Sequence, residues 1–145
     1  MLDLVLAIAH HILVFGLFGI LFAELMLVRP GIDLPTIQRV GRIDLAYGAL
    51  AGLIIVVGFA RAGMAAKGWD YYAHNGFFWA KIGVFLLVGL LSVPPTIALI
   101  RWRRSGVAPT DQQVKGVRRF IHYEAALFAL LPAFAAAMAR GYGQF

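Results

Sequence analysis

Four long apolar stretches fill most of this chain, and each is long enough to cross a lipid bilayer. A membrane-spanning helix needs roughly 20 predominantly apolar residues to cross about 30 Å of hydrocarbon. Hydrophobic residues make up 61% of the 145 residues and charged residues 14%, which is not the balance of a soluble domain. The stretches that meet the length requirement are residues 4–28, 45–64, 77–100 and 120–138. The sequence therefore predicts an all-α integral membrane protein with four transmembrane helices.

The connections between these helices are short, so little of the chain remains for a second domain. We expect residues 1–145 to form a single domain, an antiparallel up-down four-helix bundle. Residues 36–42 are expected to form a short interfacial helix that leads into the second span, and Thr110 or Asp111 to cap a similar lead-in to the fourth. Kinks are expected at the prolines inside the third and fourth helices, which are Pro94, Pro95 and Pro132.

Basic residues gather in and beside two of the three connections, which predicts the orientation of the bundle. Short loops rich in Lys and Arg stay on the cytoplasmic side of a membrane. Nine basic residues flank the first and third connections: Arg29, Arg39, Arg42, Arg101, Arg103, Arg104, Lys115, Arg118 and Arg119. The opposite side has Arg61, Lys67 and Arg140. We therefore expect a bacterial inner-membrane protein with both termini periplasmic, and the net charge of +6 to anchor it in the lipid bilayer rather than to bind nucleic acid.

Several polar side chains lie inside the apolar stretches, where charge costs several kcal/mol and normally faces the bundle interior or a cavity. The first group is expected near the periplasmic side and comprises His10, His11, Arg61, Trp79 and Lys81. The second is expected near the cytoplasmic side and comprises Glu24, Asp44, Tyr47, His122 and Glu124. His10 and Glu24 are fourteen residues apart, so at 100° per residue they return to nearly the same helix face.

The carboxylates of the second group allow a structural reading as well as a functional one. They are close in sequence to arginines with which they can form ion pairs that fasten the bundle. The candidate partners are Arg29, Arg42, Arg118 and Arg119. In the functional reading, the same carboxylates bind protons or a metal.

The histidines suggest a cofactor. The chain has no cysteine, which excludes disulfides and thiolate metal sites. Neutral imidazole suits haem iron, copper and zinc. Haem b is the expected cofactor, held by His10 or His11 with Arg61 and Lys81 near its propionates; copper or no cofactor is the alternative. His122 is expected on the opposite side, too far away to share that haem. The wider set of candidate metal ligands is His10, His11, His122, Glu24 and Glu124.

Short motifs in three helices resemble those of known bacterial membrane families. They are His10-His11-Ile12-Leu13, Phe78-Trp79-Ala80-Lys81 and Arg119-Phe120-Ile121-His122-Tyr123-Glu124. The chain resembles the bacterial four-helix protoporphyrinogen oxidase family and its copper-resistance-D-like relatives, and is more closely similar to an uncharacterised bacterial membrane family, a domain of unknown function. The oxidase resemblance implies bound haem b, a functional histidine at His10 or His11, and catalytic roles for Trp79 and Lys81. The oxidases have a helix-one arginine where this chain has Leu25 and Met26.

Three functions follow from these observations. The first is a haem- or metal-binding inner-membrane protein, with oxidoreductase or electron-transfer activity toward a redox partner. The second is a proton-coupled small-solute permease, in which Glu24, His122 and Glu124 relay protons and Lys81 gates the periplasmic end. The third is a non-catalytic scaffold, which can be a homodimer that packs through Gly48 and Gly52, or a bundle that uses these glycines internally.

Overall fold

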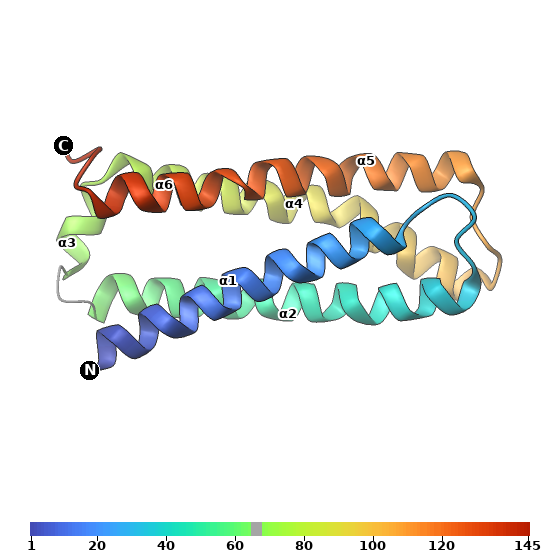
Figure 1. Cartoon of the computed structure of the whole chain (residues 1–145), viewed down its shortest axis with the longest axis horizontal. Coiled ribbons are helices and arrows are strands. Elements are labelled where there is room, and N and C mark those ends of the chain that lie inside the picture. The colour runs from blue at the N-terminus through green and yellow to red at the C-terminus, as the bar shows by residue number, and fades with distance from the viewer. Residues whose placement is uncertain (65–67) are drawn as a thin grey trace.

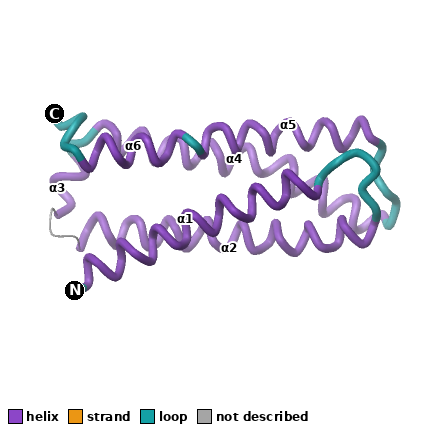
Figure 2. Tube along the Cα trace, in the orientation of Figure 1, coloured by secondary structure: helices purple, strands orange, loops and turns teal. Residues whose placement is uncertain are grey.

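The computed structural model describes residues 1–64 and 68–145 and consists of helices joined by short connections (Figures 1 and 2). Four helical segments are long and apolar enough to span a membrane, and they pack antiparallel as predicted. Lys67 lies outside the described residues. The helices are α1 (Leu2–Leu27), α2 (Leu34–Met64), α3 (Gly68–Ala73), α4 (Gly76–Ser105), α5 (Asp111–Phe128) and α6 (Leu130–Ala139).

The second span begins earlier than the hydropathy pattern predicts. The interfacial lead-in and the apolar segment form one continuous helix, α2, which starts at Leu34 instead of Leu45. Asp33 precedes it and accepts a hydrogen bond from the Thr36 backbone N–H at 2.9 Å. Hydrogen bonds from the Thr36 hydroxyl and N–H hold the pKa of the Asp33 carboxyl below its ordinary value. A capped start of this kind lets the helix extend through polar sequence before it enters lipid.

The fourth span has the helical lead-in that the sequence predicts, capped by Thr110. Thr110 accepts a hydrogen bond from the Gln113 backbone N–H, and the Gln113 side chain accepts one from the Thr110 N–H, so the two residues form a capping box. From this cap α5 runs to Phe128, where Ala129 separates it from α6. Pro132 explains the interruption, because its ring nitrogen has no hydrogen to donate to the carbonyl four residues earlier. In contrast, α4 continues through Pro94 and Pro95.

Each helix packs against its neighbours around the bundle. α1 lies beside α2, α2 beside α4, and α4 beside both α5 and α6, while α1 closes the ring against α5. The two arginine-rich connections meet at one end of the bundle, which we call the arginine end (Figure 1). Both termini and α3 lie at the other end, which we call the terminal end. The predicted clustering of the basic connections is therefore present in the fold.

The fully buried apolar side chains concentrate in the half of the bundle next to the arginine end. In α1 the buried residues are Leu17, Leu21 and Glu24, all in its second half, and in α6 the buried residue is Leu131. Most of the other buried core residues lie closer to the arginine end. They include Val28, Ile32, Ile37, Val40, Leu99, Trp102, Val114, Val117 and Ile121. The half next to the terminal end is more loosely packed.

Hydrogen bonds tie the connections together at both ends. At the arginine end, Arg118 of α5 donates to the backbone carbonyls of Leu25 and Val28, which lie at the C-terminus of α1. At the terminal end, buried Asn75 caps α4 by accepting from the Phe77 and Phe78 backbone N–H groups, and its amide donates to the Tyr142 carbonyl at 3.0 Å. These bonds hold the helix ends while lipid surrounds the sides.

Candidate functional site

Three carboxylates from three helices are buried in the arginine half of the bundle. Glu24 of α1 is 3% exposed, Asp44 of α2 9% and Glu124 of α5 2%. Each occupies a position that an apolar core residue would otherwise fill. Glu24 follows Leu17 and Leu21 along one stripe of α1, and Glu124 follows the buried residues Val114, Val117 and Ile121 along α5 at spacings of three and four. Helix periodicity thus directs all three inward.

Two hydroxyl groups bind these carboxylates. Tyr47 of α2 donates to Glu124 Oε2 at 3.2 Å, and Thr96 of α4 donates to Asp44 Oδ1 at 2.8 Å. Tyr47 is itself buried, so its hydroxyl lies inside the bundle with Glu124. Within the described residues, Glu24 Oε1 is buried without a hydrogen-bond partner. We call Glu24, Asp44 and Glu124, with Tyr47 and Thr96, the carboxylate cluster.

The ion pairs that the sequence suggested for these carboxylates are absent from the described part of the chain. No lysine or arginine nitrogen there lies within 4.0 Å of a cluster carboxylate; the pair that meets this distance is His74 with Asp70, at 3.3 Å, near the terminal end. Arg118, one of the expected partners of these carboxylates, instead binds the carbonyls at the end of α1. The negative charge of the cluster is therefore not compensated by a neighbouring cation.

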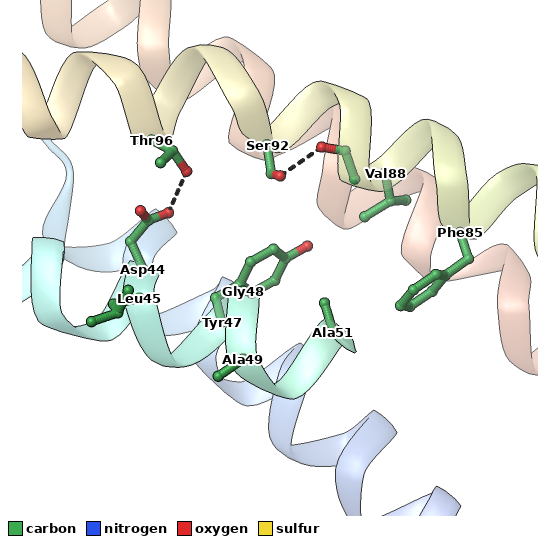
Figure 3. A pocket seen from close by; sticks show the side chains of 11 residues that line it. Asp44, Leu45, Tyr47, Gly48, Ala49, Ala51, Phe85, Val88, Ser92 and Thr96 are labelled. Atoms are coloured by element: carbon green, nitrogen blue, oxygen red, sulfur yellow. Dashed lines mark hydrogen bonds between the residues drawn. The ribbon is translucent and has the colours of Figure 1, made fainter. Parts of the chain in front are cut away.

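A pocket of about 440 Å³ lies between α2 and α4 and adjoins the carboxylate cluster (Figure 3). Asp44, Tyr47 and Thr96 of the cluster line it, so the pocket reaches one of the three acids, Asp44, directly. Most of the remaining wall is apolar, with Phe85 and Val88 on the α4 side. Its lining, mostly apolar with a few polar groups, is of the kind found at small-molecule sites, and the pocket is open on one side.

A second polar group lies in the terminal half, made of one basic side chain from each of three helices. His10 of α1, Arg61 of α2 and Lys81 of α4 are all half-buried in this half of the bundle. Within the described residues, His10 Nδ1 and Arg61 Nε are buried with no hydrogen-bond partner. The His10 ring lies against Gly58, where an added Cβ would be 3.5 Å from His10 Cε1. We call these three residues the basic cluster.

The other candidate site residues face away from both clusters. His11 and His122 are exposed on the bundle surface, and each places its Nδ1 beside a carbonyl of its own helix, at 2.7 Å from Ala7 O and 2.8 Å from Arg118 O. Trp79 is 48% exposed and donates to the Ala73 carbonyl at 2.9 Å. No group of three His, Asp or Glu side chains able to hold a metal occurs among residues 1–64 and 68–145. The five candidate metal ligands are thus not brought together.

The small residues of α2 are not used for close packing inside the bundle. A Cβ added at Gly48 or at Gly52 would meet nothing within 4 Å, and the same is true of Gly16 and Gly19 on α1. Packing within one bundle therefore does not account for the small-residue face, and a homodimer through this face stays a prediction.

Sequence reasoning grouped Glu24, Asp44, Tyr47 and Glu124 by depth but missed Thr96 and the pocket. A single threonine in an apolar helix gives no signal of its own, because its significance depends on which helix lies opposite. Asp3 was also missed; it lies on the inward stripe of α1, two turns before His10, and its Oδ1 is buried without a partner in the described structure.

A family model matches residues 2–143 of the chain and is described as predicted membrane protein (DUF2214). The chain belongs to this family. The expectation of an uncharacterised membrane family is therefore confirmed, as is that of a multi-pass membrane protein with four candidate spans. Neither the curated proteins nor the solved structures contain a match to this DUF2214 chain, so the resemblance to the oxidase and copper-resistance-D-like families stays a prediction.

Proposed function

We propose that this protein is a proton-coupled carrier for a small solute, with the carboxylate cluster as its proton-binding site. The observation that carries the proposal is the burial of three carboxylates without a neighbouring cation in the described chain. Ionisable groups inside a membrane are expensive, and they mark proton relays and substrate pathways in transport proteins. The bacterial inner membrane, in the orientation set by the basic connections, is the proposed location.

Three carboxylates can stay buried in a membrane protein only if their negative charge is compensated. An isolated ionised carboxylate is strongly disfavoured in a medium of low dielectric constant, and three neighbouring negative charges also repel one another. Because no cation lies beside the cluster in the described chain, protons are what can neutralise its negative charge. Tyr47 can pass a proton to or from Glu124 because its hydroxyl is already hydrogen-bonded to that carboxylate. The cluster is therefore suited to taking up and releasing protons as its surroundings change.

The neighbouring pocket connects this proton site to a solute. Asp44 and Tyr47 belong both to the pocket wall and to the cluster, so an occupant of the pocket would alter the polarity around both. A change in the environment of one carboxylate then changes proton occupancy of the group, which is the minimum requirement for coupling. His122, which the sequence suggested as a relay residue, is exposed on the bundle surface and is not part of this proposal.

Proton uptake can be measured directly in the purified protein reconstituted in lipid. Infrared difference spectra recorded across a pH titration should contain a protonated-carboxyl band that Glu24→Gln and Glu124→Gln each reduce. In vesicles with an interior pH-sensitive dye, the same variants should reduce proton flux driven by an imposed pH gradient by at least ten-fold. His122→Gln is the matched control and should leave both signals unchanged. Full flux in the stable, correctly inserted Glu24→Gln protein would overturn the proposal.

Binding of haem b remains a second candidate function, and the position of His10 favours it. His10 faces the bundle with a buried, unpartnered Nδ1, whereas His11 points away from it. In this proposal His10 would be one axial ligand, and Arg61 and Lys81 would bind the propionates. Haem would supply one-electron chemistry. The remaining described histidines and carboxylates offer no assembled metal site.

Absorption spectra distinguish this candidate. Protein expressed with haem supply and purified in mild detergent should have a Soret band that shifts on reduction with dithionite, and elemental analysis should find iron. His10→Ala should abolish the band, whereas His11→Ala should retain it. A colourless and metal-free wild-type protein would exclude the haem hypothesis and leave the proton-coupled carrier.

A further inference from the structure

We infer that the basic cluster of His10, Arg61 and Lys81 is a binding site for an oxyanion, with a carboxylate or phosphate group as the ligand. His10 of α1 and Arg61 of α2 each bring a buried nitrogen atom into the terminal half, where the His10 ring lies against Gly58, three residues before Arg61, and Lys81 enters the same half from α4. As the substrate class of the carrier, this inference rests on the proposed function, although binding itself can be measured separately.

Arg61 and Lys81 lack an acidic partner in the described structure. A buried arginine or lysine in a membrane protein normally pairs with an acidic side chain or binds backbone carbonyls. Neither Arg61 nor Lys81 has a carboxylate oxygen within 4.0 Å in the described structure. Lys81 Nζ lies 5.5 Å from the centre of the Phe78 ring, a contact that offers weak stabilisation only. An external anion would supply the missing negative charge.

Two nitrogen atoms of the basic cluster are unsatisfied in the described structure. Arg61 Nε and His10 Nδ1 are buried and make no hydrogen bond with the described residues. A buried N–H donor without an acceptor is unfavourable by about 1–3 kcal/mol, so such groups are normally satisfied. Guanidinium groups match the oxygen atoms of carboxylates and phosphates in geometry as well as in charge. The orphaned nitrogens therefore mark where ligand oxygens would bind.

The surroundings of the cluster favour a ligand of low charge. Asp3 lies two turns from His10 on the same stripe of α1, and its Oδ1 is buried without a hydrogen-bond partner in the described structure. Its negative charge offsets part of the positive charge of Arg61 and Lys81 at this end of the bundle. A singly charged carboxylate completes this balance better than an anion with several charges.

Packing also leaves the basic cluster accessible. α1 packs against α5 near the arginine end, but within the described residues it makes no close approach to α6 near the terminal end. The three side chains are half-buried rather than enclosed. A small anion arriving from the terminal end therefore has a shorter route to this cluster than to the carboxylate cluster in the other half.

The site and the proton cluster together explain how a charged solute could cross the bundle. One singly charged carboxylate and one proton carry no net charge together, so their combined movement avoids the cost of taking an anion through lipid. In this arrangement the basic cluster selects the anion, and the carboxylate cluster supplies the proton.

Thermal unfolding in a neutral maltoside detergent tests the binding of soluble ligands. Sodium acetate and sodium phosphate should raise the midpoint relative to sodium chloride at matched ionic strength, with a concentration dependence that yields a dissociation constant. Arg61→Gln and Lys81→Gln should weaken acetate binding by at least ten-fold. Arg61→Lys should retain part of the affinity, and Arg140→Gln, which changes an exposed arginine, should retain all of it.

A second arm distinguishes a soluble anion from a lipid headgroup. The protein is placed in nanodiscs of phosphatidylcholine with or without phosphatidylglycerol, and the same midpoints are measured. Stabilisation by phosphatidylglycerol that Arg61→Gln removes would identify an anionic headgroup as the oxyanion. The inference is overturned if acetate, phosphate and phosphatidylglycerol all leave the midpoint unchanged, or if folded Arg61→Gln and Lys81→Gln bind like wild type. Loss of carboxyl-band titration with intact acetate binding would instead refute the proton-coupled function alone.

Discussion

The two halves of the bundle differ both in packing and in the sign of their buried charge. The arginine half contains most of the fully buried apolar side chains and three buried carboxylates. The terminal half has few fully buried side chains and a half-buried group of three basic residues. The buried core is therefore concentrated in the arginine half, and the anion access that we propose lies in the terminal half. In a membrane this division costs little free energy, because an apolar side chain that is not packed inside the bundle contacts lipid, which is equally apolar.

Removing the hydrogen bonds between α5 and the end of α1, in the arginine half, should have the largest effect on stability. Arg118→Gln removes the donor to the carbonyls of Leu25 and Val28, and hydrogen bonds to charged groups contribute about 1.5–3 kcal/mol each. We expect a loss of about 3 kcal/mol in unfolding free energy, measured by denaturation in mixed micelles. Arg140→Gln at the opposite end is the control and should change little. Equal losses in the two variants would contradict the difference between the halves.

The packing difference itself can be measured with one substitution in each half of α1. Leu21 is fully buried in the arginine half, whereas Ile8 is 51% exposed in the terminal half. Leu21→Ala should lower the unfolding free energy by about 2 kcal/mol through the cavity it leaves, the lower end of the usual range because the unfolded helices also stay in lipid. Ile8→Ala should have almost no effect. A larger loss at Ile8 would show that the terminal half is the better packed one.

Removing one hydroxyl should sharpen the description of the carboxylate cluster. Tyr47→Phe deletes the donor to Glu124 and keeps the ring, so the expected stability loss is about 1 kcal/mol. The infrared carboxyl band should shift, because the acid loses a hydrogen-bond partner. Tyr123→Phe, which alters an exposed tyrosine on the same helix as Glu124, should leave the band in place. An unchanged band in Tyr47→Phe would mean that the hydroxyl does not act on the cluster.

The smallest effect on the folded bundle is expected at the small-residue face of α2. Gly48 also lines the pocket between α2 and α4, and space is open beside it, so Gly48→Leu should hardly alter the stability of the monomer. If the protein pairs through this face, the same change should convert a dimer to a monomer in size-exclusion chromatography with light scattering. Gly16→Leu on α1 is the matched control and should leave the molecular mass unchanged. A dimer that persists in Gly48→Leu would move the interface elsewhere.

Much of the fold could be predicted from the sequence because hydropathy and span length determine it directly. The inward direction of Glu24 also followed from periodicity, since His10 and Glu24 share one stripe of α1. The outward direction of His122 was available from the same rule, because buried Val117, Ile121 and Glu124 define a face of α5 that His122 does not share.

The contacts between helices could not be predicted from one sequence. Thr96 meets Asp44 across fifty-two positions, and only the relative rotation of α2 and α4 decides whether the two side chains face each other. Similarly, Arg118 lies close in sequence to Glu124 but binds the end of α1, because the exposed carbonyls at a helix C-terminus are strong acceptors for a cation. Opposite charges that are close in the sequence therefore predicted more ion pairs than the described residues form.

The separation of the two charged clusters along the bundle has an electrical consequence. In the predicted orientation, a proton from the outside must pass the basic cluster and travel deep into the membrane before it reaches Glu24. Movement of one elementary charge through the whole membrane potential changes its energy by about 2.3 kcal/mol per 100 mV. An energised membrane, negative inside, would thus favour proton occupancy of the carboxylate cluster. Anion binding near the terminal end would cross little of that field, so one bundle would contain a voltage-dependent step and a nearly voltage-independent one.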